Sequence, residues 1–286
     1  MRSTLKTILA AALLLAAVTV ASAQQLGGDG YVQAMDFDKG AGRLNWQTGF
    51  ITATGYGAPP ANAVNIAQAN AMARRAATVI ARRNLLEMLQ GVHIDSTTTV
   101  QDAMVASDTV VNRVRGFLQN SQILETHYLS DGSVEVVVGI NMRGGLTESV
   151  IPQTTPYNPE PVAPAVPGQP EAAGAWSGLL VDATGLGARP AMSPKILDPT
   201  GGEVYGTAMV SREYAIQQGM AGYAKDIEKA RVNTRVADTP LVVKAVGVDG
   251  KAKTNLVVDA ASAEAIRNAA KDQNFLEKCR VMIILD

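Results

Sequence analysis

The sequence contains a single cysteine, Cys279, in 286 residues. One cysteine excludes a disulfide within the chain. The segment that follows it, Arg280 to Leu285, is mostly apolar, so we expect a strand there and a buried, unreactive thiol. Cys279 also lies too far along the chain to carry an N-terminal lipid.

Excess charge, histidine and catalytic motifs are scarce as well. Lys and Arg number 25 against 26 Asp and Glu, which gives a formal charge of −1. So weak a field does not favour nucleic-acid binding. The chain has two histidines and lacks G-x-S-x-G and H-E-x-x-H motifs. We therefore expect that the protein is not an enzyme and has no catalytic residue, no cofactor and no metal site.

Apolar runs long enough to span a bilayer, about twenty residues, are also missing. The apolar run from Ile8 to Val20 follows Arg2 and Lys6 and precedes Ala21-Ser22-Ala23. This order is typical of a secretory signal peptide cleaved after Ala23. We expect a periplasmic protein without a transmembrane span; the alternative is an uncleaved N-terminal anchor.

Proline is concentrated in one segment. Six of the 13 prolines fall between Thr154 and Ala173. Because proline interrupts helices and sheets, we expect an extended linker there; a proline-rich ligand for a partner domain is the alternative. The predicted organisation is a signal peptide (1–23), an N-terminal extension (24–48), a first domain (49–150), the linker (151–175) and a second domain (176–286).

The two domains are expected to be small α/β sandwich-like units, which makes the fold class α+β. The first domain has the predicted order β-α-β-α-β-β: residues 49–57, 62–90, 92–100, 101–119, 123–129 and 133–142. In its long helix, Ala63, Ala67 and Ala71 recur at helical spacing. The second domain has the predicted order β-β-β-α-β-β-α-β. Its helices are expected at 211–230 and 262–278, its hairpin at 240–258 and its last strand at 280–285.

A glycine-containing loop follows the first predicted strand of the second domain. Gly185 and Gly187 suggest a dinucleotide fingerprint, but Pro190 replaces its third glycine and Pro194 would interrupt the helix that must follow. A later acid, Glu203, begins a strand instead. We interpret the loop as a glycine-dependent bend, beside which Arg189 forms an ion pair or binds a carboxylate.

Two further patterns suggest metal sites weakly. Asp36-Phe37-Asp38-Lys39-Gly40 resembles the start of a calcium loop, but its fifth position is Gly40 and its twelfth is Gln47. His93 and Asp95 alternate on a predicted strand and would share one face. A third ligand is not indicated, so we expect His93 and His127 to be structural or solvated.

The long helix carries paired arginines. Arg74-Arg75 and Arg82-Arg83 are eight residues apart, which predicts two basic steps on roughly one face. Such a face is either solvated and ion-paired, or it contacts a partner or lipid headgroups.

Residues 50–142 resemble the small domain of the flagellar basal-disc lipoprotein (FlgP-like) family, and they are similar to the N-terminal domain of the flagellar ring protein FlgT. The shared features are a strand ending in ATGYG, an A-x3-A-x3-A helix leading into ARRNLLEMLQGV, and the hairpin SDGSVEVVV. The resemblance implies a non-enzymatic envelope or flagellar-assembly protein. The chain departs from the lipoprotein members because no cysteine follows the signal, so we expect outer-membrane association without a lipid anchor.

These observations favour a structural or assembly protein of the cell envelope, with envelope or flagellar proteins as partners and a homo-oligomer as its form. A periplasmic module that binds a small molecule or glycan between the domains, near Arg189, is the alternative. A hydrolase would require His93 or His127 to meet an acid and a nucleophile in the folded chain.

Overall fold

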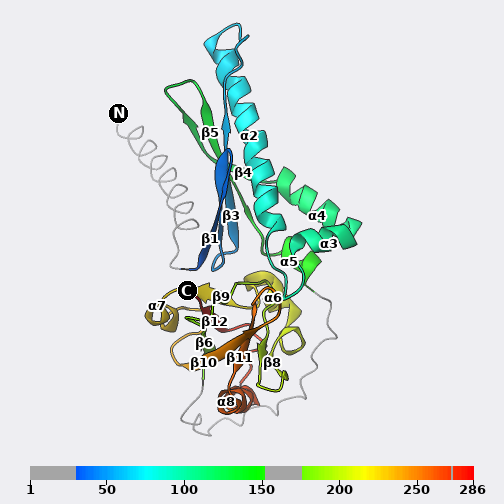
Figure 1. Ribbon diagram of the computed structural model, residues 1–286, viewed down its shortest axis with the longest axis vertical. Helices are drawn as coiled ribbons and strands as arrows, with labels where there is room; N and C mark the ends of the chain where they lie inside the picture. The colour runs from blue at the N-terminus through cyan, green and yellow to red at the C-terminus, as the bar shows by residue number, and fades with distance from the viewer. Residues whose placement is uncertain (1–29, 152–175, 272) are drawn as a thin grey trace, which may run out of the picture.

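The computed structural model describes residues 30–151, 176–271 and 273–286, which form two parts stacked along the long axis of the molecule (Figure 1). The expected signal peptide and nearly all of the expected linker lie outside the described residues. The mixed α+β class with two sheets in two domains is confirmed. Within the described part of the chain, no helix is both long enough and apolar enough to cross a membrane.

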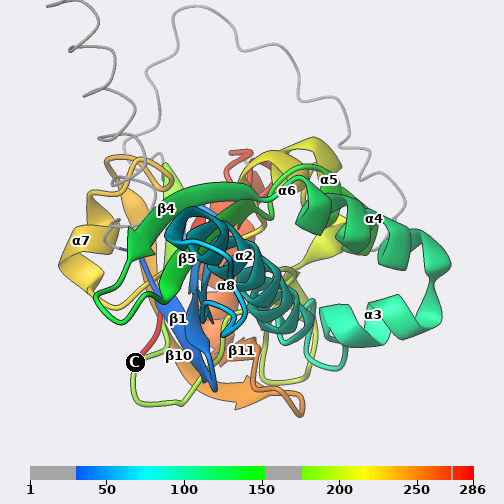
Figure 2. The ribbon, with the colours of Figure 1, turned by 90° about the horizontal axis from the view of Figure 1, so that it is seen from above.

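The first domain is an antiparallel sheet with one long helix on it. Its strands run in the order β1-β2-β3-β5-β4. They are β1 (Val32–Phe37), β2 (Gly40–Asn45), β3 (Phe50–Gly57), β4 (Gln122–Tyr128) and β5 (Val134–Asn141). The helices are α2 (Ile66–Gln90), α3 (Val100–Ala106), α4 (Asp108–Gln119) and α5 (Gly145–Val150). Seen from above, α3 and α4 extend to one side of α2 (Figure 2).

Helix α2 lies unusually close to β3. A Cβ atom on Gly55 would lie 2.2 Å from the backbone nitrogen of Ala81, and one on Gly57 would lie 2.2 Å from the carbonyl oxygen of Ala73. Ala73, Ala77 and Ala81 are fully buried at this contact. The alanines that pack on the sheet are therefore not Ala63, Ala67 and Ala71, although the four-residue spacing is the same.

Three expectations for the first domain need correction. The segment 24–48 is not merely an extension, because residues 32–45 form β1 and β2 of the sheet. Residues 92–100 do not form a strand, since Asp95 Oδ1 accepts hydrogen bonds from the amides of Thr97 and Thr98 and folds the chain into a turn. The helix expected at 101–119 is divided at Ser107 into α3 and α4.

The second domain has a seven-stranded sheet in the order β8-β7-β11-β10-β6-β12-β9. Its strands are β6 (Gly178–Asp182), β7 (Ile196–Leu197), β8 (Glu203–Tyr205), β9 (Gly222–Ala224), β10 (Pro240–Asp249), β11 (Asn255–Val258) and β12 (Val281–Ile284). The neighbours β10-β6, β6-β12 and β12-β9 are parallel. Its helices are α6 (Arg212–Gln218), α7 (Ile227–Arg231) and α8 (Ala260–Lys271); α7 and α8 contact the sheet, and α6 contacts α5 of the first domain.

The hairpin β10-β11 and the closing strand β12 agree with expectation, but both predicted helices differ. The helix expected at 211–230 breaks at Gly219, whose φ of 78° ends α6, and β9 and α7 follow. The helix expected at 262–278 begins at Ala260 and ends at Lys271. Its N-terminus is capped by Asp259, whose carboxylate accepts the amide hydrogen of Ser262.

Candidate functional site

The loop after β6 holds a carboxylate, and that carboxylate belongs to the same chain. The amide of Gly185 donates to Asp286 Oδ1 at 2.6 Å, and the amide of Gly187 donates to Asp286 Oδ2 at 3.2 Å. Both glycines have positive φ, 79° and 62°, which aims their amides at one point. The loop is thus a glycine-dependent bend that links the carboxyl ends of β6 and β12.

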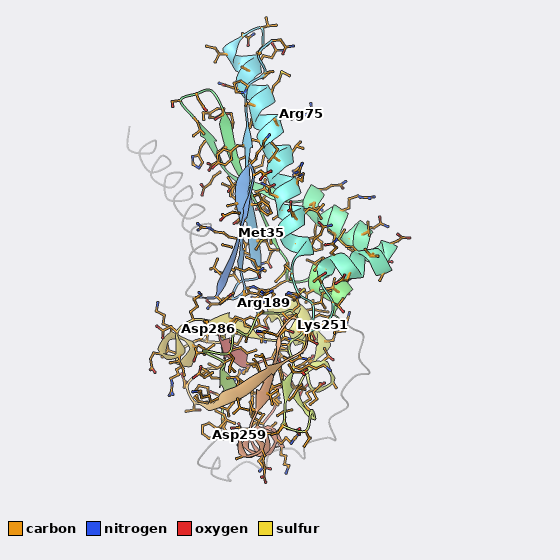
Figure 3. The ribbon with its side chains drawn as sticks, viewed as in Figure 1. Met35, Arg75, Arg189, Lys251, Asp259 and Asp286 are labelled. Carbon is orange, nitrogen blue, oxygen red and sulfur yellow. The ribbon has the colours of Figure 1, made fainter. Side chains whose placement is uncertain are left out.

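Arg189 and His93 lie at the junction of the two domains. The amide of Met192 donates to the carbonyl oxygen of His93 at 2.9 Å, and the amide of Ser193 donates to that of Ile94 at 2.7 Å. Partial burial, and then the positive charge of Arg189, lower the pKa of His93. Arg189 itself is exposed (Figure 3), so His93 is a partly buried residue beside a solvent-facing cation.

The two histidines are not brought together. His127 lies on β4 beside Glu135 of β5, which in turn pairs with Tyr56 near the far end of β3. Its Nε2 lies 3.0 Å from Glu125 Oε2 in an exposed hydrogen bond. His127 lies level with the first part of α2, whereas His93 follows the last residue of this helix. At a rise of 1.5 Å per residue, the two histidines are about 25 Å apart along the helix axis. A site that uses both histidines is therefore excluded by geometry.

The calcium-like segment is the turn of the β1-β2 hairpin. Phe37 pairs with Gly40, so Asp38 and Lys39 form a two-residue connection, and Gly40 has a φ of 141°. Among the residues that the structure describes, no group of three or more His, Cys, Asp or Glu side chains is placed to hold a metal ion. The segment is therefore built as a turn rather than as a twelve-residue calcium loop.

The paired arginines of α2 do not form one narrow face. Arg82 Nε donates to Ser121 Oγ at 3.1 Å beside β4. Arg83 instead lines an open groove of about 800 Å³ beside the β1-β2 turn, at the opposite edge of the sheet. Arg74 and Arg75 are exposed. Arg82 and Arg83 are thus directed to opposite edges of the sheet, and the cations are spread over the outer surface of α2.

The space between the domains is filled rather than open. Trp46 of the first domain meets Tyr223 of the second edge-on, with ring centroids 5.4 Å apart. The amide of Tyr31 donates to the carbonyl oxygen of Tyr223 at 2.9 Å, and that of Gly144 donates to Ile216 at 3.0 Å. The cavity beside Trp46 measures about 20 Å³, which suits one water rather than the several hundred Å³ of a ligand pocket.

Two partly buried arginines lie on either side of this junction. Arg143 donates to the carbonyl oxygen of Gln47, and burial lowers its pKa to about 10. Arg235 donates to the carbonyl oxygens of Gly219 at 3.1 Å and Cys279 at 2.7 Å. Backbone carbonyl oxygens thus accept hydrogen bonds from both guanidinium groups. The sequence did not single out these arginines, because neither has an acidic residue at a spacing that predicts an ion pair.

The single thiol is inert, as expected. Cys279 is fully buried, and burial raises its pKa to about 11. It precedes β12, in agreement with the predicted strand.

Asp286 was missed by sequence reasoning, although one signal points to it. Parallel strands place their carboxyl ends at the same edge of a sheet. A polar residue after the last strand is therefore a candidate partner for a glycine loop after the first strand of the domain.

Comparison with known proteins finds two family models, each matching part of the chain. Residues 56–141 are similar to the LPP20 lipoprotein family. Residues 178–286 are similar to the second domain of Treponema pallidum Tp0624. No curated protein matches the chain. The first domain is thus similar to a lipoprotein family, consistent with the resemblance to FlgP-like lipoproteins at that coarse level, and the similarity to FlgT stays a prediction.

Proposed function

We propose that the protein is a non-enzymatic structural or assembly protein of the cell envelope, exported to the periplasm. The similarity of the first domain to a lipoprotein family supports association with the envelope. The burial of Cys279 does not suit lipid attachment at that residue. We therefore assign the association to protein contacts.

The open sheet of the first domain carries this proposal. Strands β1 and β4 form its two edges, and unpaired edges are templates for contact with other chains. Large apolar side chains are also exposed around the end of the domain distant from the second domain. They include Tyr56, Val64, Ile66, Tyr128 and Leu129. Grouped apolar exposure of this kind marks contact surfaces.

The finer role that we propose is that of a subunit or adaptor in an envelope complex such as a flagellar accessory ring. Its basis is the resemblance of residues 50–142 to flagellar basal-disc lipoproteins. Envelope or flagellar proteins are the partners that this role requires.

Site-specific photo-cross-linking in intact cells tests the proposal. A photoreactive residue in place of exposed Tyr128 on edge strand β4 is expected to cross-link to envelope proteins, and the protein is expected in the periplasmic or outer-membrane fraction. The control replaces exposed Lys244 on β10 of the second domain. Cytoplasmic fractionation, or equal cross-linking from both positions, would contradict the proposal.

A binding module for a small polar molecule or glycan is the second candidate, and the groove beside the β1-β2 turn favours it. Asp36, Lys39, Arg83 and Glu87 line this groove of about 800 Å³, a volume within the range of ligand pockets. The site near Arg189 between the domains, which was the alternative considered from the sequence, is replaced by this one because the cavity at the junction measures about 20 Å³. A glycan that raises the melting temperature of the wild type but not of Arg83→Ala would support it.

A further inference from the structure

The two exposed sides of the first domain carry opposite charge. From residue 39 to residue 86 the chain has no Asp or Glu, while it has Lys39, Arg43 and the four arginines of α2. From residue 116 to residue 142 it has no Lys or Arg, while it has Glu125, Asp131 and Glu135. The first segment supplies the outer surface of α2, and the second supplies the β4-β5 hairpin.

The outer surface of α2 combines cations with exposed apolar groups. Opposite the buried alanines, Met72 is 46% exposed and Val79 is 62% exposed. Arg75 lies between them in sequence and points away from the sheet (Figure 3), and Arg83 follows one turn after Val79. Helical geometry places these four residues within one broad outward ridge, which we call the α2 ridge.

The face of the sheet that α2 does not cover carries the acids. Val134, Val136 and Val138 of β5 are buried beneath α2, so Glu135 and Val137 point to the opposite face. Strand pairing places His127 of β4 and Tyr56 of β3 on either side of Glu135. Glu125, two residues before His127 and paired with Val137, shares this face, which we call the outer sheet face. Arg43 of β2, opposite Thr52 of β3, adds a cation to the same face.

We infer that the α2 ridge of one copy docks on the outer sheet face of a second copy. The contact pairs Arg75 and Arg83 with Glu125 and Glu135, and it buries Met72 and Val79 against the threonine and valine side chains of the sheet. It places a helix on the bare face in the way that α2 already covers the other face. The inference rests on the proposed assembly role.

A second copy suits these surfaces better than a membrane does. An anionic lipid surface would match the α2 ridge but would leave the acidic outer sheet face without a partner, whereas one chain carries both complementary charges. The two surfaces lie on opposite sides of the domain, so the contact is head-to-tail, and a docked pair retains one free α2 ridge and one free outer sheet face. Repetition therefore builds a closed ring or a filament.

Charge reversal on the full chain tests the inference, with light scattering after size exclusion over a range of concentrations as the readout. We expect the wild type to form assemblies larger than a dimer that weaken at high salt. Arg75→Glu with Arg83→Glu, and separately Glu125→Lys with Glu135→Lys, are each expected to weaken association at least about tenfold, because each variant sets like charges against one another. Lys244→Glu with Lys271→Glu, on the second domain, is the matched control and is expected to assemble as the wild type does.

Mixing the two charge-reversed variants gives the sharpest result. The reversed ridge then meets the reversed sheet face, and the remaining native ridge meets the remaining native face, so assembly is expected to return only in the mixture. Circular dichroism and thermal unfolding establish that both variants fold.

Three results would overturn the inference. They are a wild type that stays monomeric throughout, assembly that both reversals leave unchanged, and a monomer that binds phosphatidylglycerol vesicles through its arginines. In each case, envelope cross-links from residue 128 would leave the proposed function standing with a different partner.

Discussion

The two sheets of the molecule are covered differently. In the second domain, Leu180 of β6 packs with Ala230 of α7 on one face of the sheet, while Val181 packs in the cluster that contains Ile266 of α8 on the other. Every residue of β12 is buried. In the first domain, α2 is the described helix with extensive contacts to the sheet, and most of edge strand β4 is exposed.

This difference follows from strand direction. Parallel strands require crossover connections, and the helices in those connections cover both faces of the sheet. The first sheet is antiparallel throughout, so α2 covers one face of it, while the other face is exposed at Tyr56 and the neighbouring edge strand β4 is mostly exposed. The second domain is accordingly more fully packed, and the first domain has the more exposed sheet.

The largest effect is expected at the contact between α2 and the sheet of the first domain. A Gly55→Val side chain would overlap the backbone of Ala77 and Ala81, so α2 would have to leave the sheet. We expect the first domain not to fold, as followed by urea denaturation and circular dichroism. Gly116→Ala is the control, because a Cβ there has nothing within 4 Å. A Gly55→Val protein of wild-type stability would show that the contact between α2 and β3 is not required.

The next effect concerns the junction that joins the two bodies. Trp46 is 4% exposed and packs on Tyr223, so Trp46→Ala is expected to cost about 3–5 kcal/mol of unfolding free energy. Calorimetry is expected to show one transition for the wild type and two for the variant, since the domains lose their main apolar contact. Trp176→Ala is the matched control, because Trp176 is 40% exposed. One unchanged transition in Trp46→Ala would contradict a junction held by this ring.

A smaller, matched pair of substitutions compares the sheets directly. Val181→Ala on β6 removes two methyl groups from a fully buried side chain and is expected to cost about 2 kcal/mol. Val137→Ala, on the outer sheet face, is expected to cost under about 1 kcal/mol in the isolated chain. The two unfolding free energies, measured by urea denaturation at high dilution, give the comparison. Equal losses would mean that the outer sheet face is as well covered as the core of the second domain.

Elements with strong local signals could be predicted from the sequence. The glycine-containing turns at residues 130–132 and 249–251 give the two hairpins, and the helix-forming residues up to Gln90 give α2. The predicted strand at 92–100 failed because Asp95 and Asp102 bind the nearby amides of the threonine-rich run. The spacing of the alanines on α2 does not tell which of them face the sheet, because Gly55 and Gly57, distant in sequence, decide which face of the helix is buried.

The same limit applies to the candidate site. Gly185 and Gly187 predict a loop whose amides can hold an anion. The anion is Asp286, which lies 101 residues from Gly185, and a local sequence pattern cannot relate residues so far apart. The opposite charges of the α2 ridge and the outer sheet face were present in the sequence. Assigning them to opposite sides of the domain required the strand register.

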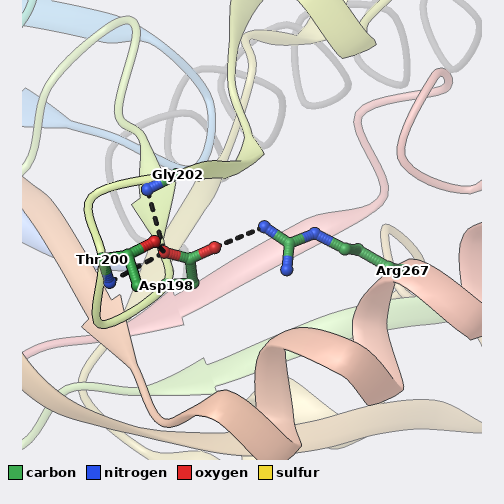
Figure 4. Close-up of polar contacts among 4 residues, drawn as sticks. All are labelled: Asp198, Thr200, Gly202 and Arg267. Atoms are coloured by element: carbon green, nitrogen blue, oxygen red, sulfur yellow. Dashed lines mark hydrogen bonds and ion pairs between the residues drawn. The ribbon is translucent and has the colours of Figure 1, made fainter.

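The smallest expected effect is a pH dependence within the second domain. Asp198 Oδ2 contacts Arg267 of α8 at 2.6 Å, and Oδ1 accepts hydrogen bonds from the amides of Thr200 and Gly202, each at 2.9 Å (Figure 4). Arg267, followed by the hydrogen bonds from Thr200 and Gly202, holds the pKa of Asp198 well below its ordinary value. The turn between β7 and β8 is thereby tied to α8.

The sign of the pH effect follows from that shift. A carboxyl group with a lowered pKa in the folded state gives stability that is fully present above the unfolded pKa of about 4. This stability is lost as the pH falls through the folded value, because the unfolded chain takes up the proton first. Asp198→Asn is therefore expected to melt below the wild type at pH 7, and the difference is expected to shrink as the pH falls below about 4. Arg267→Ala is expected to lower the melting temperature at pH 7 by part of the amount that Asp198→Asn does. A difference in melting temperature between wild type and Asp198→Asn that stays constant from pH 7 to pH 2 would show that Asp198 acts through its shape and not through its charge.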